Sequence, residues 1–288
     1  MTFADAVRLG RVSNLPTVWT NALAGQALAG GLLPPMPHAL LLIAVSLAYV
    51  GGMYLNDAFD AEVDAEERPE RPIPSGRASR PAVFAGGFAM LTASVLFLAA
   101  IGAMSGTGPW PASAGVLLAA LIVVYNWHHK ENALSPLLMG LCRVLVYFAA
   151  ALAVTVHLTP ALWIGAVLLL CHLIGLTYLA KQETLGRAAN FWPLVFLGAP
   201  AAYGVALIVR EPIAAFFWLL LIASIGASLR FAIRRGPGDI QRSVMILIAA
   251  ISLLDALLIA GQGMGRLALL AAFGFLATLA AQRYVKGT

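Results

Sequence analysis

The feature that most constrains this chain is a series of about ten apolar runs, each about 17 to 23 residues long, spread over its 288 residues. At 1.5 Å rise per residue, a helix of that length crosses the ~30 Å hydrocarbon layer of a bilayer. Hydrophobic residues make up 61% of the sequence and charged residues 11%, whereas soluble domains carry roughly 25% charged residues. The runs also lack the apolar–polar alternation of barrel strands. The sequence therefore predicts an all-α, polytopic transmembrane helical bundle of nine to ten spans.

The expected spans follow one another without a linker that would divide the chain. Residues 1–288 are therefore expected to form a single domain, in which residues 3 to 13 form a short interfacial helix before the first span. The spans are expected at residues 15–33, 39–55, 82–104, 111–127, 135–157, 160–180, 192–209, 213–230, 241–261 and 266–283.

The basic residues predict the orientation of the bundle. With ten spans, fifteen of the eighteen Lys and Arg residues fall on the side that holds both termini, and only Arg210 and Arg266 fall on the other. Because cytoplasmic loops are enriched in Lys and Arg, the side with the termini is predicted to be cytoplasmic. This placement explains the net charge of +5 without nucleic acid as a partner. We expect an integral, multi-pass protein surrounded by membrane lipid, in a bacterial inner membrane, with its active-site loops in the cytoplasm.

Seven of the thirteen acidic residues fall within residues 57–70, at the cytoplasmic end of the second expected span. Here Asn56, Asp60 and Asp64 follow one another at intervals of four residues, which places their side chains on one face of a helix. Mg²⁺ prefers such oxygen ligands, usually one or two carboxylates together with phosphate oxygens. The spacing predicts a magnesium site at the mouth of the bundle.

A basic, proline-rich loop follows directly, because residues 68–77 read RPERPIPSGR. Its three prolines exclude a regular helix and predict a stiff loop. Guanidinium groups beside Mg²⁺ are suited to a diphosphate, whose negative charge they stabilise as it leaves. The alternative is a solvated loop whose charges only mark the membrane surface. The four-residue spacing beside the basic loop favours the binding site.

The segment NDAFDAEVDAEERPERPIPSGR, residues 56–77, resembles the first Asp-rich motif of the UbiA superfamily of intramembrane prenyltransferases. That motif reads N-D-x-x-D-x-x-x-D followed by R-P-L/I-P-S-G, and it also lies in a cytoplasmic loop after the second span. The resemblance implies transfer of an isoprenoid group from its diphosphate to an acceptor. It further implies Asn56, Asp60 and Asp64 as magnesium ligands, with Arg68 and Arg71 as diphosphate contacts.

Two later loops also bear on the resemblance. The segment YNWHHK looks like the family's Tyr/Lys loop, with one additional residue between Tyr125 and Lys130. Lys130 is expected either to contact phosphate beside Tyr125 or to be an ordinary lysine of a cytoplasmic loop. After the sixth span, where the family usually has a second Asp-rich motif, this chain has Lys181, Glu183 and Arg187. Glu183 is expected to complete a reduced metal site, while Lys181 and Arg187 bind phosphate directly.

Two ionisable residues, Arg143 and Asp255, lie inside apolar spans. Such a group costs several kcal/mol unless it is paired or faces water. Arg143 is expected either to reach into the substrate cavity or to pair with Asp255, for which a structural role is favoured. Arg11, Asn14 and Asn21, near the first span, are further candidates to line the cavity.

The preferred hypothesis is a magnesium-dependent prenyltransferase whose mouth binds an isoprenyl diphosphate and whose apolar cavity excludes water. Asp60, Asp64 and Lys130 are its expected catalytic residues. A hydrophobic acceptor within the membrane, such as an aromatic acid, a quinone precursor, a porphyrin, a sugar phosphate or a lipid, would capture the allylic cation. The alternative is a noncatalytic protein on the same scaffold that binds or transports isoprenoid lipids, a hypothesis motivated by the reduced second motif.

Overall fold

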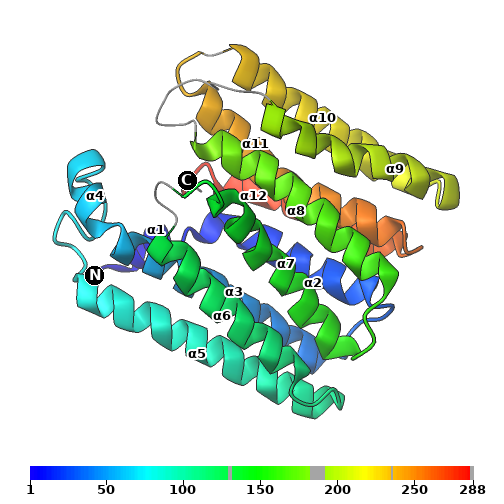
Figure 1. Cartoon of the computed structure of the whole chain (residues 1–288), viewed down its shortest axis with the longest axis horizontal. Helices are drawn as coiled ribbons and strands as arrows, with labels where there is room; N and C mark the ends of the chain where they lie inside the picture. The colour runs from blue at the N-terminus through cyan, green and yellow to red at the C-terminus, as the bar shows by residue number, and fades with distance from the viewer. Residues whose placement is uncertain (129–131, 182–191, 235, 286–288) are drawn as a thin grey trace.

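The computed structural model describes residues 1–128, 132–181, 192–234 and 236–285, and in these ranges all regular structure is helical (Figure 1). Two 3₁₀ segments, η1 (Val12–Asn14) and η2 (Trp192–Leu197), precede α2 and α9. The α-helices are α1 (Phe3–Leu9), α2 (Leu15–Leu28), α3 (Pro35–Phe59), α4 (Ala61–Glu67), α5 (Arg80–Ser105), α6 (Trp110–His128), α7 (Ser135–Val154), α8 (Pro160–Lys181), α9 (Gly198–Arg210), α10 (Ala214–Arg234), α11 (Asp239–Ala260) and α12 (Gly265–Ala281).

Each apolar run of the sequence coincides with one of these helices. Within the described residues, seven helices are long and apolar enough to cross a membrane, namely α3, α5, α6, α7, α8, α10 and α11. Two shorter apolar helices cover Leu194–Arg210 and Gly265–Ala281, and the 14-residue α2 occupies the first expected span. The predicted all-α membrane bundle is confirmed, and these elements are roughly consistent with nine to ten crossings. The short helix expected before the first span corresponds to α1 followed by η1.

Local sequence explains where several helices begin and end. Proline stands in the first turn of α2, α3, α5 and α7, where its missing N–H costs no helical hydrogen bond. The Ser79 side chain accepts a hydrogen bond from the backbone N–H of Ala82 at 3.4 Å and caps α5. The same helix ends at Ser105 and is capped by Gly106, whose φ of 71° favours glycine.

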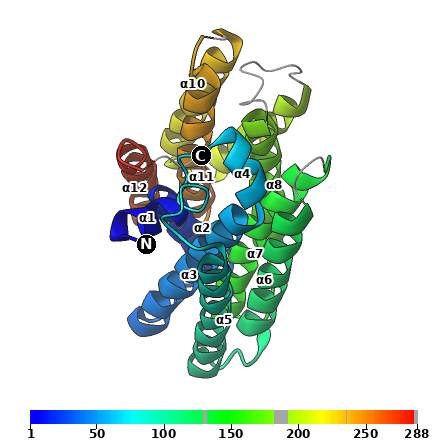
Figure 2. The ribbon, with the colours of Figure 1, turned by 90° about the vertical axis from the view of Figure 1, so that its left-hand side faces the viewer.

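Helix α11 forms the core of one half of the bundle. It contacts α2, α8, α10 and α12, and every side chain from Leu247 to Ala260 is buried. Figure 2 shows α11 between these neighbours. The outer helices instead expose large apolar side chains, such as Leu117, Leu219 and Phe273. Extensive exposed apolar surface marks a face that contacts lipid or protein, and the length of these helices favours lipid.

Helices α3 and α5 pack closely through glycine. A Cβ atom at Gly51 would lie 2.9 Å from the backbone oxygen of Gly87, and one at Gly87 would lie 2.8 Å from the Leu55 side chain. Small residues permit such close approach of membrane helices. This contact fixes α3, which carries the first half of the acidic motif.

The connections that carry the sequence motifs gather at one end of the bundle. Helices α1 and α4 and the N-terminus lie together there (Figure 1). Helix α3 ends at Phe59, α6 ends at His128, α7 begins at Ser135 and α8 ends at Lys181. Residues next to all four of these points line one cavity. The antiparallel arrangement of neighbouring helices therefore brings motifs far apart in sequence to one place.

Candidate active site

A cavity of about 420 Å³ lies between the α3–α5 connection and helices α6, α7, α8 and α11. Its wall is polar near that connection and mostly apolar farther into the bundle, where Val45, Leu118 and Ile248 contribute beside Arg143. Lys130, Glu183 and Arg187 lie outside the described residues. The other sequence-predicted site residues all line the cavity: Asn56, Asp60, Asp64, Arg68, Arg71, Tyr125 and Lys181.

The chain bends at Asp60, which separates α3 from α4. The backbone N–H of Asp60 nevertheless donates to the backbone oxygen of Asn56 at 3.0 Å, and that of Asp64 donates to the backbone oxygen of Asp60 at 2.8 Å. Helical spacing therefore continues through the bend, and all three side chains are buried beside the same cavity. The structure thus forms this face from two helices, where the sequence predicts one.

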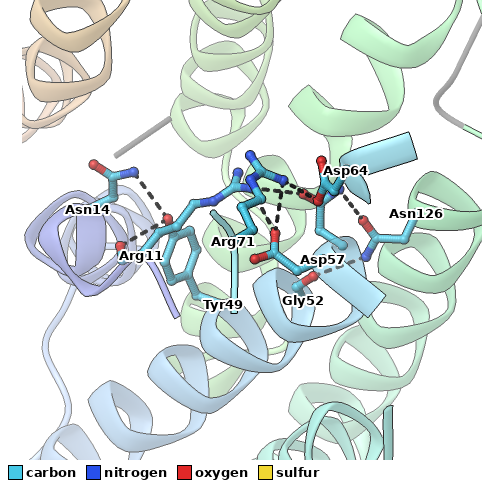
Figure 3. Close-up of polar contacts among 9 residues, drawn as sticks. Arg11, Asn14, Tyr49, Gly52, Asp57, Asp64, Arg71 and Asn126 are labelled. Carbon is cyan, nitrogen blue, oxygen red and sulfur yellow. Dashed lines mark hydrogen bonds and ion pairs between the residues drawn. The ribbon is translucent and has the colours of Figure 1, made fainter. Parts of the chain in front are cut away.

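Asp57 holds two arginines at the mouth of the cavity (Figure 3). Its Oδ1 atom lies 3.1 Å from Arg11 Nη2 and 3.5 Å from Arg71 Nη1, and Arg71 Nη1 also lies 2.6 Å from Asp64 Oδ2. The Asp57 side chain is 8% exposed, so salt screens these pairs weakly. Asp57 therefore draws the N-terminal segment and the proline-rich loop onto one carboxylate cluster. Sequence reasoning missed this role, since Asp57 lies off the four-residue spacing and was marked only by its place in the acidic cluster.

Asn126 connects the acidic motif to α6. The Asn56 side-chain amide donates to Asn126 Oδ1 at 3.1 Å, and the Asn126 amide donates to the Gly52 backbone oxygen at 3.1 Å. Both asparagines are buried. The contact orients Asn56, whose own oxygen accepts from Arg11 at 3.1 Å. Asn126 directly follows Tyr125 in the predicted Tyr/Lys loop, but no local pattern indicates that its side chain would contact α3.

Arg11 reaches the site from the segment before α2. Its φ of 42° lies in the left-handed region, which residues other than glycine seldom adopt. Such strain is found at functional sites, where the surrounding contacts stabilise it. Burial lowers the pKa of Arg11, but the Asp57 carboxylate together with Tyr49 and Tyr125 outweighs burial and raises the pKa above its ordinary value. Arg11 therefore stays charged, and it lines the cavity together with Asn14, as the sequence predicts.

The proline-rich loop is folded back against the bundle. Arg71 pairs with Asp64, and Arg77 Nε donates to Asp5 Oδ1 in α1 at 3.0 Å. Hydrogen bonds from Thr2, followed by the charge of Arg77, lower the pKa of Asp5. The structure describes every residue between α4 and α5, and none of them is helical. These contacts favour an ordered wall over the alternative of a freely solvated loop.

The donor set at the mouth fits Mg²⁺ bound together with a phosphate ligand. Among the described residues, no three His, Cys, Asp or Glu side chains are grouped as a ready-made metal cage. Mg²⁺ needs no such cage, because it is usually held by one or two carboxylates, waters and substrate phosphate oxygens. Asp60 and Asp64 offer two carboxylates on one cavity wall. Three cations, Arg68, Arg71 and Lys181, line the same cavity.

Arg143 combines both of the roles that the sequence allowed. It lines the cavity, and its guanidinium donates to Asn21 Oδ1 at 3.0 Å. The Asn21 amide donates in turn to both carboxylate oxygens of Asp255, at 3.1 and 2.9 Å. The expected direct pair is therefore replaced by a bridge through Asn21, which is buried behind the wall and does not line the cavity.

Comparison with known proteins agrees with this geometry. Residues 17–235, about three quarters of the chain, match the UbiA prenyltransferase family. The chain belongs to this family. It is therefore a membrane prenyltransferase, and the family resemblance of its acidic motif is confirmed.

Two of its relatives are each named digeranylgeranylglyceryl phosphate synthase. The protein of Methanopyrus kandleri is 28% identical over 209 residues, which cover 71% of this chain and 71% of the relative. The protein of Methanoculleus marisnigri is 37% identical over 108 residues, which cover 35% of this chain and 38% of the relative.

Two solved structures share the fold. One, described as "Structural and mechanistic insights into the biosynthesis of Digeranylgeranylglyceryl phosphate synthase in membranes", has a TM-score of 0.54 and 16% identity, and the match covers 98% of this chain and 99% of that chain. The other, the apo structure of a UbiA homolog from Aeropyrum pernix K1, has a TM-score of 0.53 and 18% identity, with 95% and 97% covered. At these identities the likeness shows the fold alone.

Proposed function

We propose that this protein transfers an isoprenoid group from its diphosphate to a lipid-like acceptor in the membrane, and that the reaction requires Mg²⁺. The observation that supports this proposal most directly is the cavity. Its polar mouth is lined by Asp60 and Asp64 together with Arg68, Arg71 and Lys181, and its interior is mostly apolar. An amphiphilic substrate with a diphosphate head and a hydrocarbon tail matches both parts. Residues 1–288 are proposed to act as one domain, because this cavity draws its wall from the N-terminal segment through α11.

Asp60 and Asp64 are the proposed magnesium ligands, with Asn56 beside them and Glu183 as a further candidate. When bound, Mg²⁺ would neutralise charge on the diphosphate. The proposed diphosphate contacts are Arg68, Arg71, Tyr125, Lys130, Lys181 and Arg187. In the structure Arg71 pairs with Asp64 at 2.6 Å, so an incoming phosphate would share this arginine with the carboxylate.

The chemistry proposed for the cavity follows from charge. The allylic C–O bond breaks, and its electron pair leaves with the diphosphate, where the guanidinium groups of Arg68 and Arg71 stabilise the negative charge. The apolar wall holds the remaining allylic cation away from water, since Val45, Leu118 and Ile248 offer no nucleophile. The acceptor then forms the new bond to the allylic carbon and loses its proton.

The proposed location follows from the distribution of basic residues. The mouth of the cavity lies on the side that carries most Lys and Arg residues, which the positive-inside rule assigns to the cytoplasm. A bacterial inner membrane stays a prediction from the sequence, since the relatives described above come from Methanopyrus kandleri and Methanoculleus marisnigri.

A transfer assay tests the proposal. Purified protein in lipid vesicles is incubated with radiolabelled geranylgeranyl diphosphate and a total lipid extract as the source of acceptors, with and without Mg²⁺. Labelled lipid product and free diphosphate are expected only with Mg²⁺, and Asp60→Asn is expected to lower both about 100-fold or more. Glu66→Gln removes an exposed carboxylate of α4 and should leave the rate unchanged. Normal turnover by folded Asp60→Asn would refute the metal assignment, and isoprenoid binding without diphosphate release would favour a noncatalytic role.

A further inference from the structure

Arg143 lines the cavity of the candidate active site but is separate from the carboxylates at its mouth. Its Nη1 donates to Asn21 Oδ1 at 3.0 Å, and its Nη2 donates to Thr17 Oγ1 at 3.1 Å. Its Cζ atom lies 5.3 Å from the centre of the Tyr49 ring. Across the part of the chain that the structure describes, no carboxylate lies within ion-pair distance of Arg143. The guanidinium is therefore held by neutral groups while it faces the cavity.

A buried network behind the wall fixes this arginine. The Asn21 amide donates to both oxygens of Asp255, so its own oxygen is turned toward Arg143. The Tyr147 hydroxyl donates to Asp255 as well. Asn21, Asp255 and Tyr147 are all fully buried, whereas Arg143 is only partly buried. Asp255 is thus a positioning residue, which acts on Arg143 through Asn21.

The position of Arg143 separates it from the diphosphate contacts. Tyr49, against which it packs, precedes Asn56 by seven residues of α3, roughly 10 Å along the helix. Arg11 and Arg71 at the mouth are paired with Asp57, whereas Arg143 has no such carboxylate. A charged group within a membrane is costly unless an opposite charge or water compensates it. Asp255 provides an opposite charge only from behind the wall, through Asn21, and an anionic group inside the cavity would pair with the guanidinium directly.

We propose that Arg143 binds an anionic group, a carboxylate or a phosphate, on the acceptor substrate. This inference rests on the proposed transfer function, because it assigns the acceptor to the cavity beneath the donor diphosphate. The positive charge of Arg143 would then pair with the negative charge of the acceptor beside the apolar wall. This pairing would hold the acceptor near the allylic carbon. The guanidinium offers paired N–H donors to both carboxylate and phosphate groups.

Binding of two matched probe pairs tests the inference. One pair is geranylgeranylglyceryl phosphate and geranylgeranylglycerol, and the other is 4-hydroxybenzoate and 4-hydroxybenzyl alcohol. Affinities are measured in detergent with the mouth already saturated by Mg²⁺ and geranylgeranyl thiodiphosphate, so that the probe's anion cannot bind there. The wild type is expected to prefer the anionic member of one pair about tenfold or more. The pair that shows the preference distinguishes phosphate from carboxylate.

Four variants separate Arg143 from a general effect on the fold. Arg143→Gln is expected to abolish the preference, and Arg143→Lys to retain part of it because the charge remains. Asp255→Asn is expected to weaken it, because Asn21 can then turn its oxygen away. Arg266→Gln, the same change at an exposed position, should leave the preference intact. Binding of the thiodiphosphate is expected to be the same in all four.

Several results would overturn the inference. One is that the wild type, in both probe pairs, shows no preference for the anionic member. Another is that Arg143→Gln keeps the wild-type preference unchanged. Loss of thiodiphosphate binding in folded Arg143→Gln would assign this arginine to the donor instead. Arg143→Gln would fail to fold only if the charge itself is structural, and the other two variants then decide. If Arg143→Lys and Asp255→Asn, as separate variants, both keep the full wild-type preference for the anionic probe, the proposal is refuted. A wild type that binds no thiodiphosphate would instead contradict the proposed function itself.

Discussion

Removing the charge of Asp57 should loosen two arginines at once. In Asp57→Asn the side chain keeps its shape, but Arg11 and Arg71 each lose a carboxylate partner at 3.1 and 3.5 Å. A pair of charges 4 Å apart is worth about 4 kcal/mol at an effective dielectric constant of 20. Much of this is offset, because Arg71 retains Asp64, the Arg11 side chain is 19% exposed to solvent, and burial already disfavours the charged form of Asp57. We expect a net loss of about 1.5–3 kcal/mol in the free energy of unfolding, the value of a hydrogen bond to a charged group.

Thermal unfolding in detergent provides the measurement, and hydrogen exchange over residues 68–77 reports on the loop. A loss of this size corresponds to a melting temperature lower by roughly 3–10 °C, with faster exchange in the loop that Arg71 anchors. Glu66→Gln is the matched control, because this exposed α4 carboxylate has no ion pair among the described residues. If Asp57→Asn melts with the wild type and its loop exchanges at the same rate, the central role given to Asp57 is incorrect.

Two further predictions concern packing and pH. Gly51→Ala should destabilise the protein by about 1–3 kcal/mol, because its Cβ would lie 2.9 Å from a backbone oxygen of α5. Gly226→Ala should instead stabilise the protein by about 0.5–1 kcal/mol, because its Cβ would meet no neighbouring atom within 4 Å. Equal melting temperatures for the two variants would contradict this prediction. Hydrogen bonds from Thr2 and the charge of Arg77 hold the pKa of Asp5 below its unfolded value of 3.8, so their stabilisation is complete above that pH and is lost as the pH falls through the lower folded pKa. The protection factors of the α1 amides, which are exchange rates corrected for the intrinsic pH dependence of hydrogen exchange, should therefore stay constant between pH 7 and pH 5 and fall only in stronger acid, and Asp5→Asn should remove that fall; a lower protection factor already at pH 5 would show that the contact does not hold α1.

The elements and part of the site could be predicted because they depend on local patterns. Each apolar run became a helix, since its length and composition are suited to a membrane wherever its neighbours lie. The spacing of Asn56, Asp60 and Asp64 placed them on one wall, because helical hydrogen bonds continue through the bend at Asp60. The prolines after Arg68 likewise predicted a nonhelical loop.

The partners of these residues could not be predicted, because they depend on how the helices pack. Nothing near Asp57 in the sequence indicates that Arg11, 46 residues away, would pair with it. The bridge from Arg143 through Asn21 to Asp255 joins three helices, and the sequence showed only that two charges needed compensation. Such contacts follow from the tertiary structure, in which one intervening amide replaced a direct ion pair.

Binding of geranylgeranyl thiodiphosphate to purified protein, with and without Mg²⁺, tests most directly whether the mouth is a magnesium and diphosphate site. This analogue resists ionisation, so the measurement requires no acceptor. We predict binding that depends on Mg²⁺ in the wild type and in Glu66→Gln, and that is lost in Asp60→Asn although the variant remains folded. Binding of equal strength without Mg²⁺, or in Asp60→Asn, would contradict the assignment of Asp60 and Asp64 to the metal.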